Sequence, residues 1–370
     1  MKPFTKESDG HYYWLDLIRF LAAFAVMACQ FRSTFFVEYS LLPTSQQNPA
    51  IFSFYSLTRL GEEAVLVFFV LSGLLVGGKA IKRIVNGSFQ IKSFVIDRFV
   101  RIMLPLVSAL IMYIPIALAF NLPLSVTNWI GSLFSVQFIL TGPAFETLWS
   151  LSYEVWFYIL TFSIGVIMSR RIKVTSYKYA IGCLMLFLAM MVFVKLECYY
   201  LFIWILGALA LWKILPRNNL ILGLSFIVWM ITIVLLQYSS GSHFIGDNSL
   251  NMGGFRKIIS LLFGLSFSIF VQQIIQTRPT NKFLIRLNSV GTKLAVFSYT
   301  LYLTHMPVVR LLSGLGFPKS ETISLSSCML YIAEMAIGLI VAYAIYWVFE
   351  RNTTKVKNFI KAKISKSSLR

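Results

Sequence analysis

WLDLIRFLAAFAVMACQFRSTFF, residues 14–36, is the stretch that decides how this chain folds. It is long and apolar enough to cross a lipid bilayer as a single helix. The same stretch carries Asp16, Arg19, Gln30 and Arg32. Ionisable groups inside a spanning helix cost roughly 3 kcal/mol each on insertion scales, so their presence indicates a function.

The spacing of these polar residues places them on one side of the predicted helix. Asp16 and Arg19 are three positions apart and can pair on one face. Arg19 and Gln30 are eleven positions apart, which is close to three turns, or about 16 Å along the helix axis. We therefore predict that this face forms one wall of a polar channel.

The composition of the whole chain agrees with a membrane protein. Of the 370 residues, 58% are hydrophobic and only 13% are charged, whereas soluble domains are about a quarter charged. The apolar residues form long continuous runs and do not alternate every second position, which favours helices over a barrel. We predict an all-α integral membrane protein.

Apolar windows of about twenty residues predict ten transmembrane helices around a buried polar tunnel. The windows are 14–36, 57–80, 102–120, 148–168, 178–195, 198–213, 219–237, 256–277, 294–314 and 323–349. An even number of spans places both termini on the same side of the membrane.

The distribution of basic residues predicts which side this is. If both termini are cytoplasmic, the inner segments hold 25 of the 33 Lys and Arg residues, and the outer segments 37–53, 121–147 and 238–254 hold none. This asymmetry follows the positive-inside rule. It also explains the net charge of +19 more simply than binding to nucleic acid does. We expect membrane lipids, and no nucleic acid, among the partners.

We predict one polytopic membrane domain over residues 1–350, followed by a basic cytoplasmic tail over residues 351–370. The tail is expected to lie on anionic lipid headgroups as a solvated helix, or to be disordered. The outer segment 121–147 is partly apolar, and a re-entrant or interfacial helix is expected within it. The four cysteines lack metal-ligand spacing, so no metal site is predicted.

Further polar residues lie inside or at the ends of the predicted spans, and each has a simple structural interpretation. Glu62, Glu63 and Glu334 can be ordinary interhelical hydrogen-bond partners. Arg98 and Arg101 can be positive-inside anchors. A histidine beside a proline, such as His305, can cap a broken helix.

The combination of these residues favours chemistry over structure. A histidine, a carboxylate and paired arginines on facing helices supply a base, an orienting acid and a phosphate clamp, which group transfer inside a membrane requires. The residues concerned are His305, Glu154 and the pair Arg98 and Arg101.

Five sequence blocks, in this order and spacing, resemble membrane acyltransferase family 3. They are LDLIR with a polar residue eleven positions after the arginine, FFVLSG at 68–73, the R-x-x-R pair at 98–101, WSLSYEVWFY at 149–158 and SYTLYLTH at 298–305. The resemblance covers nearly the whole chain. It implies a ten-helix enzyme of the bacterial inner membrane.

The resemblance also implies a reaction and its participants. Such enzymes transfer an acyl group, usually acetyl from acetyl-CoA, onto hydroxyl groups of cell-surface glycans or related acceptors, and lipopolysaccharide or a lipid-linked sugar is an acceptor of this class. Acetyl-CoA would be the acyl donor, and no metal is implied. The acceptor's identity, the acyl chain length and the oligomeric state cannot be deduced from the sequence.

Roles for individual residues follow from the same resemblance. Arg98 and Arg101 match the cytoplasmic pair that meets the CoA donor, and guanidinium groups bind phosphates bidentately. Arg19 matches the first-helix arginine of the donor tunnel. Glu154 matches a glutamate that orients or activates the acceptor, and His305 matches a histidine that could polarise the thioester carbonyl.

Gln30 departs from the family pattern, which usually has a histidine there; the resemblance implies that this histidine is the general base or the transient acyl carrier. Glutamine cannot take up a proton near neutral pH or act as a nucleophile. Three interpretations follow: an inactive substituted form, which we favour, a natural member in which His305 takes over, or a member that binds without turnover.

A proton-coupled transporter of a small anionic solute is the alternative function. Ten helices with buried Arg, Glu and His also suit a carrier, but a carrier is expected to show inverted repeats. The sequence contains no repeat of fixed period, and a cytoplasmic R-x-x-R pair is better explained by a phosphate-bearing donor.

Overall fold

A computed structural model describes residues 12–169, 176–212, 214–239, 253–277, 279 and 281–367. Within these ranges the chain is helical and contains no strand. The first half comprises α1 (Tyr13–Phe35), α2 (Pro49–Thr58), α3 (Gly61–Ser72), the π-helix η3 (Gly73–Gly78), α4 (Lys79–Val85), α5 (Ile91–Ala119), α6 (Val126–Leu133) and α7 (Trp149–Met168). The second half comprises α8 (Ser176–Lys195), α9 (Tyr199–Ala210), α10 (Asn219–Ser239), α11 (Gly253–Ile274), α12 (Lys282–Ala295), α13 (Ser298–Gly314), α14 (Leu325–Val348) and α15 (Thr353–Ser367).

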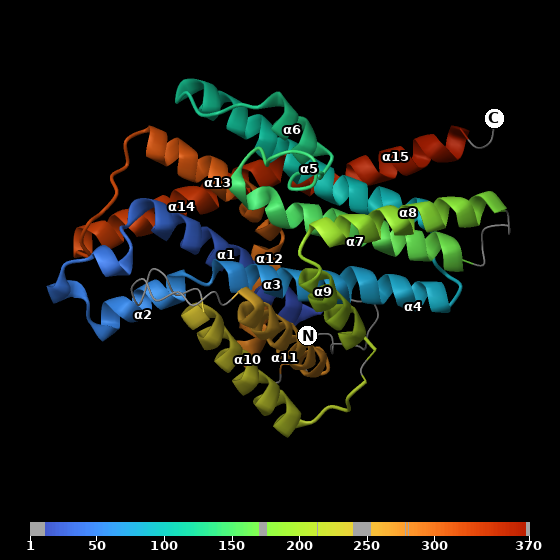
Figure 1. Cartoon of the computed structure of the whole chain (residues 1–370), viewed down its shortest axis with the longest axis horizontal. Coiled ribbons are helices and arrows are strands. Elements are labelled where there is room, and N and C mark those ends of the chain that lie inside the picture. The colour runs from blue at the N-terminus through green and yellow to red at the C-terminus, as the bar shows by residue number, and fades with distance from the viewer. Residues whose placement is uncertain are drawn as a thin grey trace.

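The first helix lies at the centre of the molecule, as its sequence predicts. α1 packs against α3, α12, α13 and α14, and it runs through the middle of the assembly in Figure 1. Its Ala23, Met27 and Phe31 side chains are fully buried and lie four positions apart, on one face of the helix. This face anchors α1 in the core, while its polar residues face cavities.

Eight helical stretches are long and apolar enough to cross a membrane in the described part of the chain. All ten predicted windows are helical, but two of the helices are short. α9 has only 12 residues, and α13 has 17 residues that are mostly buried and include several polar side chains. The all-α membrane fold is confirmed, whereas the count of ten spans stays a prediction.

A glycine-rich contact brings the second predicted span close to α9. A Cβ atom on Gly73 would lie 2.0 Å from the carbonyl oxygen of Trp204, and one on Gly207 would lie 2.2 Å from that of Val70. Only a residue without a side chain allows the two backbones to approach this closely. The contact includes the π-helical turn η3, and such turns often occur at functional sites.

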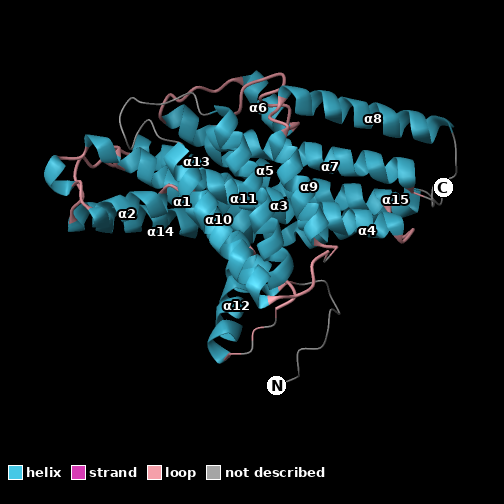
Figure 2. Cartoon of the chain, turned by 60° about the horizontal axis from the view of Figure 1, so that its bottom comes forward, coloured by secondary structure: helices cyan, strands magenta, loops and turns pink. Residues whose placement is uncertain are grey.

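Two helices add detail to what the sequence predicts. α12 is a separate helix on the N-terminal side of the predicted ninth span, and Figure 2 shows it projecting beyond the other helices. The basic C-terminal segment forms α15, which packs against α5. There Asp97 pairs with Lys357 at 2.8 Å and with Lys361 at 3.1 Å. The tail is therefore a helix held by protein contacts as well as by any lipid.

The expected helix in segment 121–147 is present as α6.

Candidate functional site

A cavity of about 410 Å³ brings together most of the residues that the sequence singles out. Arg19 of α1, Arg98 and Arg101 of α5, and Glu154 of α7 all line it. These residues lie up to 135 positions apart in the sequence, and three different helices supply them. We call this space the inner cavity, because the beginnings of α1 and α5 lie on the predicted cytoplasmic side.

The inner cavity carries an excess of positive charge. Two basic residues of α4, Lys79 and Arg83, line it together with the three arginines. The carboxylates in its lining are Asp16, Asp97 and Glu154. Five cations therefore face three carboxylates, and such an excess favours an anionic ligand.

Two of these carboxylates have basic partners of their own. Asp16 pairs with Arg19 at 3.4 Å, which confirms the predicted pair on one face of α1. Asp97 pairs with the lysines of α15 at the edge of the cavity. These two carboxylates therefore form ion pairs within the protein.

Glu154 is fixed within the inner cavity by a tyrosine one turn later. The hydroxyl of Tyr158 donates a hydrogen bond to the Glu154 carboxylate. The ring of Tyr158 also lies under the guanidinium of Arg98, with 5.7 Å between the Arg98 Cζ and the ring centroid. Glu154 therefore lines the same cavity as the three arginines.

A second cavity, of about 840 Å³, lies at the other ends of the helices. It is lined from the end of α1, the start of α3, the start of α7 and the ends of α8 and α10. With the termini cytoplasmic, each of these helix ends faces the outside of the membrane. We call this space the outer cavity.

Gln30 lines the outer cavity. Its backbone carbonyl accepts hydrogen bonds from Ser33 at 3.0 Å and Thr34 at 2.9 Å. Its side-chain amide has no hydrogen bond to the described residues, so it is available to a ligand. Arg19 and Gln30, on one helix, therefore serve two different cavities.

The inner and outer cavities meet at two side chains. Val65 of α3 and Tyr302 of α13 line both of them. The Tyr302 hydroxyl donates to the backbone carbonyl of Thr147 at 3.1 Å and lies 2.5 Å from the hydroxyl of Ser150. These hydrogen bonds hold the tyrosine at the boundary. A continuous tunnel between the cavities stays a prediction.

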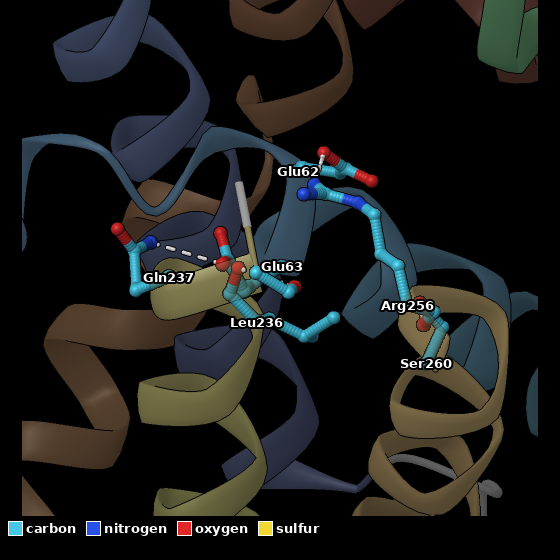
Figure 3. Close-up of polar contacts among 7 residues, drawn as sticks. Glu62, Glu63, Leu236, Gln237, Arg256 and Ser260 are labelled. Carbon is cyan, nitrogen blue, oxygen red and sulfur yellow. Dashed lines mark hydrogen bonds and ion pairs between the residues drawn. The ribbon is translucent and has the colours of Figure 1, made fainter. Parts of the chain in front are cut away.

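The glutamates at the outer cavity have partners on neighbouring helices, as their structural interpretation predicts. Glu62 accepts a hydrogen bond from Arg256 of α11, and Glu63 accepts one from Gln237 of α10 at 2.9 Å. Figure 3 shows both contacts. Glu334 of α14 differs, because its buried carboxylate has no hydrogen-bond partner in the described structure.

His305 lies in neither cavity lining. Its side chain is fully buried in α13. Its Nδ1 lies 3.3 Å from the carbonyl oxygen of Leu301, and its Nε2 has no hydrogen-bond partner among the described residues. The structure therefore brings His305 within one helical turn of the boundary residue Tyr302, without placing it against either space.

Sequence reasoning missed several residues of these cavities. Lys79 and Arg83 were counted only as positive-inside charges, although they follow the FFVLSG block on the same helical stretch, Pro49–Val85. Tyr158 and Tyr302 lie within recognised blocks, but a tyrosine in an apolar helix gives no separate signal. Arg32, two residues after Gln30, lines the outer cavity, and its charge within the first span was the available signal.

The geometry suits transfer of a group from an anionic donor. The inner cavity offers guanidinium groups to phosphates, and the outer cavity offers polar and aromatic side chains to a second ligand. Within the described ranges no group of three or more His, Cys, Asp or Glu residues could hold a metal ion.

Comparison with known families gives one result. The model of a family described as an acyltransferase domain matches residues 12–351, which include both cavities. No curated protein and no solved structure matches the chain significantly.

Proposed function

The chain belongs to membrane acyltransferase family 3, and we propose that it uses acetyl-CoA to acetylate a hydroxyl group of a cell-surface glycan or lipid-linked sugar at a bacterial inner membrane. One observation carries this proposal: Arg19, Arg98 and Arg101 line a single inner cavity with Glu154. Acyltransferase activity in general follows from the family. The donor, the acceptor and the membrane are our proposal.

The donor's charge fits the inner cavity. The phosphates of CoA are compact anions, and arginine guanidinium groups bind them through two parallel hydrogen bonds. Arg98 and Arg101 would hold these phosphates, and Arg19 would extend the positive surface deeper along α1. The thin acyl-bearing arm would then point toward Val65 and Tyr302, beyond which the outer cavity begins.

In the transfer step, the acceptor in the outer cavity reacts with the donor in the inner cavity. The acceptor hydroxyl oxygen attacks the thioester carbonyl carbon, a C–O bond forms, the C–S bond breaks, and CoA leaves as a thiol. A base must take the hydroxyl proton. Gln30 cannot do so, and His305 lines neither cavity. This placement favours the interpretation of an impaired form over one in which His305 takes over.

The test is acetyl-CoA binding to the full chain in detergent, measured by isothermal titration calorimetry. Replacing Arg98 and Arg101 by alanine should weaken binding at least about tenfold per arginine, because a hydrogen bond to a charged group contributes about 1.5–3 kcal/mol. The matched control replaces Lys82 and Lys92, which are exposed basic residues outside the cavity lining, and removes the same charge.

Two results would contradict the proposal. Unchanged affinity in the arginine variant would remove the pair from the donor site. An equal loss of acetyl-CoA affinity in the lysine control would mean that the arginine pair contributes only general positive charge. The experiment also separates the proposal from a proton-coupled carrier, which need not bind acetyl-CoA.

A further inference from the structure

Arg32 is a buried cation at the outer cavity without a carboxylate partner. Its side chain lines the cavity, yet the residue is only 9% exposed. It forms no ion pair with a described residue, and its Nε–H has no hydrogen-bond acceptor there. A buried charge without a partner is costly, so its retention indicates a ligand that is absent from the protein itself.

The neighbouring carboxylates do not supply this partner, because each is engaged elsewhere. Glu62 is paired with Arg256 and Glu63 with Gln237, as Figure 3 shows. Glu197, the third carboxylate in the lining, pairs with Lys257 at 2.7 Å. The charge of Arg32 therefore remains available within the cavity.

The Arg32 guanidinium lies beside a neutral aromatic ring. Its Cζ lies over the ring of Tyr55, 5.1 Å from the centroid, which is a cation–π contact. The N–H groups of a guanidinium lie in one plane, where they match the two oxygens of a carboxylate or phosphate. Tyr55 is a neutral neighbour, so this contact does not replace a carboxylate partner.

The lining of the outer cavity also includes an aromatic cluster. Trp149, Tyr153 and Tyr200 line it and contact one another, with centroid separations of 4.9–5.9 Å. Such side chains combine apolar faces with polar edges and suit an amphipathic ligand. A cationic fork and an aromatic surface in one space describe a ligand with a neutral body and one anionic group.

We infer that the outer cavity binds an acceptor that carries a carboxylate or phosphate, and that Arg32 holds this group. The inference rests on the proposed function, because it identifies the chemical class of the acceptor. It also distinguishes two sources of the anion: an acidic sugar provides a carboxylate, and a sugar phosphate provides a phosphate.

The test titrates the full chain in detergent with three probes, namely glucuronate, glucose 1-phosphate and glucose. At least one anionic probe should bind about tenfold or more tightly than glucose, since a hydrogen bond to a charged group contributes about 1.5–3 kcal/mol. Arg32→Gln should reduce the affinity for that probe to the level of glucose. Selective binding of glucuronate identifies a carboxylate, and selective binding of glucose 1-phosphate identifies a phosphate.

Two further variants separate a binding role from a structural one. Arg32→Lys keeps the charge but loses the planar arrangement of N–H donors. It should therefore reduce the affinity for the anionic probe severalfold and leave acetyl-CoA binding unchanged. Arg310→Gln is the matched control, because Arg310 lies toward the predicted outer end of α13, pairs with Glu146 and lines neither cavity. It should bind every probe as the unaltered chain does.

The outcomes distinguish this inference from the function on which it rests. If acetyl-CoA binds but neither anion exceeds glucose, or both Arg32 variants titrate like the unaltered chain, the inference is overturned and the donor assignment stands. If acetyl-CoA does not bind to the unaltered chain, the proposed function fails, and the anion titrations still decide whether Arg32 is an anion site. If Arg32→Gln misfolds and loses acetyl-CoA binding, the affinity of Arg32→Lys for the anionic probe decides whether Arg32 holds the anion.

Discussion

Replacing Gln30 by histidine is the sharpest test of the catalytic argument. Gln30 lines the outer cavity, and its side-chain amide has no hydrogen bond to the described residues. An imidazole can therefore replace it at the cavity wall without breaking a side-chain hydrogen bond to the described residues. The exchange changes one property, the ability of residue 30 to accept a proton near neutral pH.

The magnitude follows from this single property. General base catalysis contributes about 10²–10⁴-fold in rate, and a hundredfold gain corresponds to about 2.7 kcal/mol of activation free energy. We expect Gln30→His to raise acetyl transfer at least about a hundredfold. Its rate should also rise with pH through roughly pH 6 to 7, because only the neutral imidazole can act as a base.

The assay follows CoA release from acetyl-CoA by liquid chromatography, with the purified chain and a cell-surface glycan preparation as acceptor. Mass spectrometry of glycans from cells that express either form identifies the product. Gln30→Met is the matched control, since methionine has similar length but accepts no proton, and it should not raise the rate. Equal rates for the unaltered chain and Gln30→His would refute a base at position 30.

Two further predictions concern the packing that forms the cavities. Gly207→Val should destabilise the chain by about 1–3 kcal/mol in thermal unfolding, because its Cβ would lie 2.2 Å from a backbone carbonyl of α3. Gly223→Val is the control, because a Cβ there has nothing within 4 Å, and it should unfold nearly as the unaltered chain does. Equal losses of stability in the two variants would exclude the close helix contact as the cause. Tyr302→Phe removes the hydroxyl that contacts Ser150 and Thr147 and should cost about 1–3 kcal/mol, since both groups are buried at this boundary; an unchanged unfolding temperature would show that these hydrogen bonds contribute little.

Much of the donor side could be predicted from residue types and local spacing. A charged pair three positions apart on a helix must meet, and Asp16 and Arg19 do. Arg98 and Arg101, one turn apart at the start of a span, indicated a phosphate site, and both line the inner cavity with Arg19 and Glu154. The family resemblance supplied the order of these blocks, and the family match agrees with it.

The cavity that each side chain faces could not be predicted in the same way. The family resemblance assigned Glu154 to the acceptor, yet the hydrogen bond from Tyr158 holds it in the same cavity as the arginines. His305 belonged to the expected catalytic set, but the rotation of α13 buries it away from both cavities. Depth along a helix is set locally, whereas the direction of a side chain depends on which neighbours surround the helix.

The sequence by itself determined that the chain crosses a membrane as helices, and it identified the polar residues that are too costly to be incidental. It also predicts that both termini face the cytoplasm. These properties follow from hydropathy, charge and helical periodicity, which act over one or two turns. Only the tertiary structure decided that two cavities share Val65 and Tyr302, and that Arg32 is left without a carboxylate. Those facts depend on helices far apart in the chain, whose packing no local pattern specifies.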